Sequence, residues 1–113
     1  MTTVTAKVLL ESKFIDTANA GLYTADAVRA IIDKATVTNT AATDTMLWVN
    51  LVGAALSPGD ENLAIQGRSL APGETYACPE LVGHAIEASG AVWAKASSPN
   101  SLSMRLSGRE ISD

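Results

Sequence analysis

The stretch Leu70-Ala71-Pro72-Gly73-Glu74-Thr75-Tyr76 predicts its local structure more clearly than any other part of the chain. Pro72 followed by Gly73 is typical of a type II turn, because proline presets φ at the first central position and glycine accepts the positive φ of the second. Alternating segments flank the turn at residues 63–70 and 74–77. We therefore expect a β-hairpin at the edge of a β-sandwich, and nothing in the stretch indicates an active site.

Residues 45–52 form the clearest strand of the sequence, because a period of two places aliphatic side chains on one face. The two faces carry Leu47, Val49 and Leu51 on one side and Met46, Trp48 and Asn50 on the other. If the aliphatic side faces the core, Trp48 lies outside and packs on a loop or a partner, since an exposed tryptophan is a large apolar surface.

Other segments repeat this pattern less cleanly. Alternation predicts strands at 2–10, 91–96 and 102–107. Residues 27–39 are ambiguous, because their first half has helical spacing and their second half is β-branched; we interpret them as a strand. The remaining connections are a loop at 11–22, with a helical turn left open, and a short helical turn or crossing loop at 79–86.

These segments together predict an all-β protein, a single antiparallel β-sandwich of the immunoglobulin-like or jelly-roll-like kind. We expect seven to eight short strands and one short helical turn near residues 79–86. The whole of 1–113 is expected to be one domain, with residues 1–10 as an N-terminal strand or arm.

The composition excludes several classes of function. Hydrophobic residues make up 47% of the chain, enough for a core, while charged residues make up only 18%, as in a protein that hides surface against neighbours. The net charge of −4 argues against nucleic-acid binding. No apolar run suggests a membrane span, the start lacks signal-peptide features, and the single cysteine fits synthesis in a reducing cytoplasm.

Candidate chemical groups are few and isolated. His84 is the sole histidine and has no second ligand or nucleophile beside it, so we interpret it as a loop or interface residue. Cys78 is expected to be a partly buried strand thiol rather than a nucleophile. Asp60 and Glu61 lack the oxygen-rich spacing of a calcium loop, and no phosphate-binding glycine loop is present. We expect no enzyme activity, no cofactor and no metal.

The two tryptophans are the strongest candidates for a role beyond the core. Trp48 and Trp93 each lie opposite the aliphatic face of their strand by simple alternation. Two interpretations stay open: one of them fills the sandwich interior, or both contact another chain, where aromatic anchors dominate binding energy. Near the end of the chain, Arg109 and Glu110 form either a salt-bridged strand tail or a contact that sets the register with a neighbouring subunit.

Motifs spread over nearly the whole chain resemble small structural proteins encoded by tailed bacteriophages and prophages. They are Tyr23-Thr24-Ala25, the segment from Ile31 to Thr40, Trp48-Val49-Asn50-Leu51-Val52, Leu70 to Tyr76, Glu80-Leu81-Val82-Gly83-His84 and Leu106-Ser107-Gly108-Arg109-Glu110-Ile111. The chain departs from the group at Ser89-Gly90-Ala91, where a Gly-Asp turn is usual. These are turn and strand motifs without a catalytic signature, so the resemblance implies a β-sandwich with a structural role in the virion.

The resemblance leads us to expect a head decoration or cement protein that stabilises a capsid through many subunit contacts. The alternatives are a head–tail or tail component, or a carbohydrate- or receptor-binding module. Expected partners are other virion proteins and further copies of the chain, without nucleic acid or membrane, in a virion assembled in the bacterial cytoplasm. The candidate interface residues are Trp48, Trp93, Tyr76, Met46 and Arg109.

Overall fold

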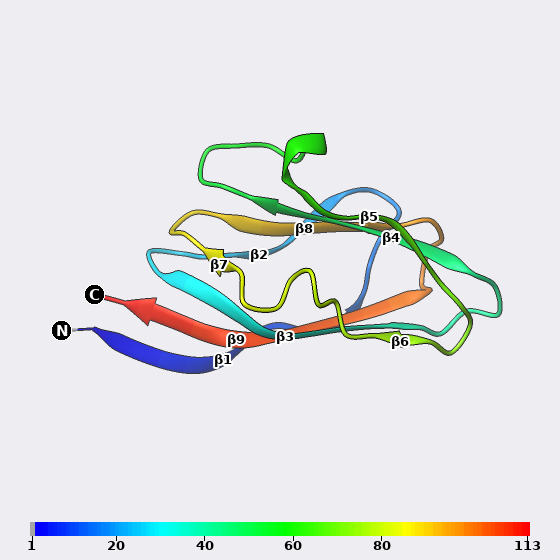
Figure 1. Ribbon diagram of the computed structural model, residues 1–113, viewed down its shortest axis with the longest axis horizontal. Coiled ribbons are helices and arrows are strands. Elements are labelled where there is room, and N and C mark those ends of the chain that lie inside the picture. The colour runs from blue at the N-terminus through cyan, green and yellow to red at the C-terminus, as the bar shows by residue number, and fades with distance from the viewer. Residues whose placement is uncertain (1) are drawn as a thin grey trace.

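The structure is a computed structural model that describes residues 2–113. Figure 1 shows two layers of strands lying face to face. The described residues form nine strands and one 3-10 helix: β1 (Thr3–Phe14), β2 (Ala20–Thr24), β3 (Arg29–Asn39), β4 (Thr45–Val52), η1 (Asp60–Asn62), β5 (Leu63–Leu70), β6 (Thr75–Tyr76), β7 (Ala85–Ile86), β8 (Ala91–Ala96) and β9 (Leu102–Ser112). The all-β class predicted from the sequence is confirmed.

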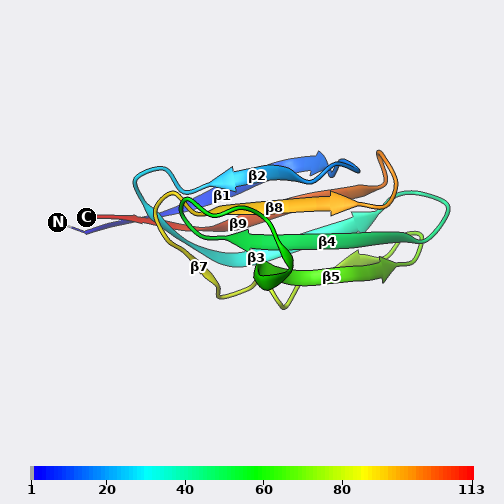
Figure 2. The ribbon, with the colours of Figure 1, turned by 90° about the horizontal axis from the view of Figure 1, so that it is seen from above.

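The two sheets are antiparallel throughout. The first has the order β1-β9-β3-β6, with β7 also paired to β3, and the second has the order β2-β8-β4-β5. Figure 2 shows the second sheet lying over the first, with both termini at the same end. The predicted antiparallel β-sandwich is therefore confirmed.

Alternation of side chains explains which residues form the core. In β8 the buried Val92, Ala94 and Ala96 alternate with half-buried neighbours, and β3 and β9 follow the same rule over much of their length. Successive residues of a strand point to opposite faces, so one face of each sheet meets the other sheet. The largest fully buried side chains include Ile15, Ile32, Leu47, Leu70, Leu81, Leu102, Met104 and Leu106.

The Pro72-Gly73 turn is present, but the expected hairpin is wrong. Gly73 has φ of 79° and the N–H of Glu74 donates to the carbonyl of Ala71 at 3.0 Å, as a β-turn requires. The strands on either side do not pair with each other, because β5 pairs with β4 and β6 pairs with β3. The turn therefore carries the chain from one sheet to the other.

Buried Asn39 at the end of β3 holds this crossing in place. Its side-chain amide donates to the carbonyls of Leu70 and Thr43 at 2.9 and 3.0 Å. Its backbone carbonyl accepts from the N–H of Gly73 at 2.8 Å. One buried amide thus ties the ends of strands in both sheets, which offsets the loss of a hairpin ladder.

Three local predictions need correction. Residues 11–22 are not one loop, because β1 runs to Phe14 with two register shifts and β2 begins at Ala20. The helical turn lies at Asp60–Asn62, whereas residues 79–83 form consecutive turns that lead into β7. The last strand continues to Ser112 because β9 pairs with β1 and β3 over its whole length.

The alternation of β4 changes phase near its end. Leu47 and Val49 are buried as predicted, but Asn50 is 4% exposed and Leu51 only half-buried. The pairing of β4 with β5 shifts register between Val49 and Asn50, which rotates the strand locally. Within residues 2–113, no helix is long and apolar enough to span a membrane.

Candidate functional site

The outer face of the second sheet carries the largest group of candidate residues. We call it the tryptophan face and define it by Met46 and Trp48 of β4 together with Trp93 and Lys95 of β8. Met46 is 39% exposed, and the other three are half-buried. Trp93 alternates with the buried Val92 and Ala94, so neither tryptophan fills the interior and both lie on this face.

Trp48 packs against a glycine in the neighbouring strand. A Cβ atom at Gly67 of β5 would lie 3.4 Å from Nε1 of Trp48 and 3.2 Å from Cε of Met46. Gly67 also has φ of 61°, a conformation that L-residues with side chains rarely adopt. The sequence therefore places glycine where the backbone bulges and where the indole lies flat across it.

Trp93 lies in the same way over β2. A Cβ atom at Gly21 would be 3.4 Å from Cε2 of Trp93, so this indole also lies across a bare backbone. Aromatic side chains that lie over a glycine in the adjacent strand shield its exposed backbone. The result is a face on which both indoles pack against a glycine of the adjacent strand.

A cation lies beside Trp48. Lys95 is its cross-strand neighbour, and the Nζ atom lies 5.0 Å from the centroid of the indole. A cation–π contact at an exposed site contributes about 0.5–1 kcal/mol. The tryptophan face is thus apolar and carries one positive charge.

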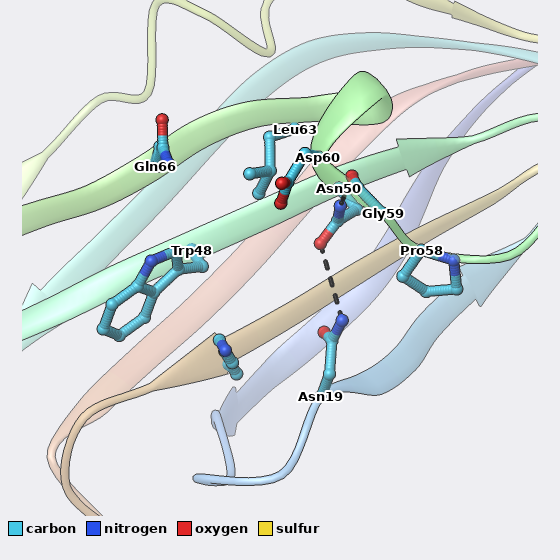
Figure 3. A pocket seen from close by; sticks show the side chains of 9 residues that line it. Asn19, Trp48, Asn50, Pro58, Gly59, Asp60, Leu63 and Gln66 are labelled. Carbon is cyan, nitrogen blue, oxygen red and sulfur yellow. Dashed lines mark hydrogen bonds between the residues drawn. The ribbon is translucent and has the colours of Figure 1, made fainter.

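A shallow depression of about 260 Å³ adjoins Trp48 on this face. Figure 3 shows Trp48 at one end and Pro58 at the other, with Asn50 and Asn19 between them. Polar side chains dominate its lining, which includes Asn19, Asn50, Asp60, Gln66 and Lys95. An aromatic ring surrounded by amides, a carboxylate and an ammonium group can contact both the apolar and the hydroxyl groups of a ligand.

Asn50 fixes the loop that forms one wall of the depression. Its Nδ2 donates to the carbonyl of Gly59 at 3.0 Å and to Oδ1 of Asn62 at 2.7 Å. Its Oδ1 accepts from Nδ2 of Asn19 at 3.5 Å. The sequence pattern assigned Asn50 to the outer face and did not predict this role, because its three partners lie 9 to 31 residues away and no local motif indicates them.

Tyr76 lies away from the tryptophan face, at the side of the sandwich. Its ring packs under the guanidinium of Arg68, with Cζ 3.9 Å from the ring centroid, and its hydroxyl donates to Glu80. Burial and the adjacent Glu80 carboxylate raise the pKa of Tyr76 to about 12. Tyr76 therefore links β5 of one sheet to β6 of the other.

Arg109 lies on the first sheet and is engaged within the chain. Its Nε and Nη2 donate to Oδ2 and Oδ1 of Asp33 at 2.9 and 2.8 Å, a bidentate pair. The hydrogen bonds from Arg109 lower the pKa of Asp33. The five candidates therefore do not form one surface, since Met46, Trp48 and Trp93 share a face that Tyr76 and Arg109 do not.

The other candidate groups stand alone. Cys78 is fully buried, with φ of 47°, and burial raises the pKa of its thiol to about 12. It lies just after β6 rather than in a strand. His84 is exposed in the turn before β7. Residues 2–113 contain no group of three His, Cys, Asp or Glu side chains that would hold a metal ion.

The outer edge of β1 is a second candidate surface. Strand β1 ends its sheet and pairs only with β9 among the described strands. Residues 3–7 are exposed, and Val4 is 56% exposed. An unpaired strand edge offers backbone donors and acceptors to another strand.

No family model matches the sequence, and no curated protein matches it. A chain in the structure of infectious bursal disease virus, Gx strain, is similar in fold, with a TM-score of 0.51 over 98% of the present chain. The likeness is one of fold. Sequence identity is 12%, and the chain spans 32% of the length of that viral chain.

Proposed function

We propose that this protein is a non-enzymatic structural subunit of a tailed-phage virion. In this proposal it is a head decoration or cement protein whose many copies contact the capsid and stabilise it. The tryptophan face carries the proposal, because it holds two fixed indoles and Met46 on one side of a rigid sheet. Such residues are enriched at the centres of protein interfaces.

The stabilisation would come from the apolar surface that each copy buries against its partner, added over many copies. Trp48 and Trp93 already lie flat, so binding a partner immobilises few additional side-chain rotamers there. Each copy then contributes a modest interface, and repetition over a symmetric shell multiplies it. The resemblance of the turn and strand motifs to phage structural proteins supports the same role, and the fold likeness to a virus chain agrees with it.

The same face would serve a head–tail or tail subunit, and symmetry separates the two. Decoration at the three-fold sites of a capsid lattice implies trimers, whereas a tail ring implies six-fold symmetry. Cryo-electron microscopy of particles from cells that carry the gene, with the protein tagged, tests both. Density on the head shell supports decoration, density at the tail supports the alternative, and absence from the particles contradicts the virion role.

A second candidate function is carbohydrate binding, which the depression beside Trp48 favours. The indole presents a ring that the C–H face of a pyranose can contact, while Asp60 and Gln66 supply groups for its hydroxyls. Titration of the purified protein with neutral oligosaccharides, followed by tryptophan fluorescence, tests this function. Trp93→Phe leaves Trp48 as the sole reporter. An unchanged signal across maltose, cellobiose and chitobiose would count against it.

A further inference from the structure

The first part of β1 is a regular, uncovered strand edge. Residues 3–8 pair with 107–112 of β9 without a register shift, whereas shifts occur at Val8/Leu10 and Leu10/Lys13. Proteins normally protect such edges with proline, bulges or several charges. Residues 3–8 contain none of these devices except a single lysine.

The hydrogen bonds of β3 show which backbone groups of the first sheet face which neighbour. Ile32 donates its N–H to the carbonyl of His84 and accepts at its carbonyl from Gly83, on the side of β7. The N–H and C=O groups of successive strand residues point to opposite sides of the strand. Those of Ile31 therefore point toward β9, where the partner of Ile31 is Arg109.

The alternation continues through β9 into β1. Because Arg109 turns toward β3, Glu110 turns toward β1, where Thr5 is its partner. Thr5 therefore faces β9, and the N–H and C=O groups of Val4, Ala6 and Val8 point to the open edge. These same three residues are apolar.

We propose that the open edge of β1 pairs antiparallel with the same edge of a second copy, about a two-fold axis at Ala6. This register sets Ala6 opposite Ala6 of the second copy and Val4 opposite Val8. The three outward-pointing residues of each strand then form about six backbone hydrogen bonds and one continuous apolar row.

Charge is compatible with this register. Lys7 is the one charged residue of the segment, and its Nζ lies 3.1 Å from Oε1 of Glu110 within the same chain. In the proposed pairing Lys7 lies opposite Thr5 of the second copy, so no like charges face each other directly. A C2 pairing of this kind is isologous and closes, so it yields a dimer and not a fibre.

The inference rests on the proposed function, since it names a second copy as one of the partners of a repeated subunit. Its test uses purified protein and is independent of the virion experiment. A protein that dimerises but is absent from particles contradicts the proposed function alone. One that is present in particles but remains monomeric in solution contradicts the pairing alone.

Proline substitutions distinguish the open edge from the closed one. Ala6→Pro removes an N–H that points outward and leaves the β1–β9 ladder intact, whereas Thr5→Pro removes an N–H that faces β9. By sedimentation equilibrium we expect the wild type to approach twice its 11.7 kDa with rising concentration. Ala6→Pro should stay at one mass with an unchanged circular dichroism spectrum, and Thr5→Pro should lose stability.

Cross-linking tests the register. Antiparallel partners in a hydrogen-bonded pair lie about 5.5 Å apart at Cα, within disulfide range, so Ala6→Cys should oxidise to a covalent dimer. Lys13→Cys, on the same strand beyond both shifts, should not. A monomeric wild type, a dimeric Ala6→Pro or equal cross-linking of the two cysteine variants would overturn the proposal. If Ala6→Pro does not fold, Ala6→Lys replaces it, because two lysines at the axis repel.

Discussion

The hydroxyl of Tyr23 donates a hydrogen bond to Oε2 of Glu110 at 2.5 Å and so joins β2 of one sheet to β9 of the other. Lys7 of β1 approaches the same carboxylate at 3.1 Å. Three strands thus meet at one acidic side chain near the end of the sandwich where the termini lie.

This arrangement makes stability depend on pH. The hydrogen bond from Tyr23 and the nearby Lys7 lower the pKa of Glu110 below its ordinary value of 4.5. A group whose pKa is lower in the folded state stabilises it above the unfolded pKa, and this contribution is lost as pH falls. We expect Glu110→Gln to be less stable than the wild type by about 1 kcal/mol at pH 7.

The difference should shrink as the pH falls below the ordinary glutamate pKa of 4.5 and the wild-type carboxyl becomes protonated in the folded state. Urea unfolding at several pH values measures it. Glu11→Gln is the matched control, since Glu11 makes an exposed ion pair with Arg105, and it should change stability by less than about 0.5 kcal/mol. A difference at Glu110 that is independent of pH would contradict the account.

Gly67→Ala should destabilise the protein by about 1–2 kcal/mol, because φ at this position is positive and the added methyl group would lie 3.2 Å from Cε of Met46, closer than an ordinary contact. The methyl group would replace solvent beside the indole of Trp48, so the tryptophan emission of the folded state should also change. Gly59→Ala is the control, since no atom lies within 4 Å of its Cβ position. Equal unfolding midpoints in urea for the two variants would refute the packing argument.

Trp48→Ala should weaken attachment to the particle by at least about tenfold, as loss of an interface anchor does, while the fold persists. Attachment is measured by co-sedimentation with particles that lack the protein, and folding by thermal melting. Leu56→Ala serves as the control, because Leu56 is 67% exposed and lies outside the tryptophan face. Normal attachment of Trp48→Ala, or failure of the variant to fold, would remove Trp48 from the proposed contact.

Leu10→Ala should lower the free energy of unfolding by about 2–5 kcal/mol, because this side chain is only 7% exposed. Ser12→Ala, two residues along the same strand and exposed, should have almost no effect. Denaturant unfolding of both variants decides whether β1 belongs to the core or acts as a detachable arm. A small effect at Leu10 would favour the arm.

Cys78 should react slowly with thiol reagents in the folded protein. Its thiol is buried, and burial raises its pKa to about 12, so little thiolate exists at pH 8. Labelling with dithionitrobenzoate should be at least about a hundredfold slower than in 6 M urea. Rapid labelling under native conditions would mean that the segment after β6 opens readily.

Strands that are specified by the sequence pattern within the strand itself were predictable from the sequence. Residues 45–52 and 91–96 carry aliphatic side chains at every second position over most of their length, and their predicted bounds coincide with β4 and β8. The Pro72-Gly73 turn was equally clear. The pairing of the strands on either side of this turn was not predictable, because the partners of β5 and β6 are set by Asn39 and by strands far away in sequence.

The extent of β1 and the site were harder to predict for the same reason. Residues 11–13 are polar and register shifts interrupt the alternation of β1 just before them, so only pairing with β9 shows that the strand continues to Phe14. The outward position of Trp48 and Trp93 was one of two open interpretations. Their seating over Gly67 and Gly21 depends on neighbouring strands, which periodicity within one strand does not specify.

The pairing of β1 with β9 also governs when the chain can fold. Strand β1 leaves the ribosome well before β9 and must wait for it, because β9 lies between β1 and β3 in the sheet. Contacts between distant parts of a chain form slowly, and a strand that waits is open to aggregation. This sandwich should therefore be completed only after β9 has been synthesised, and the backbone of residues 3–14 stays unpaired until then.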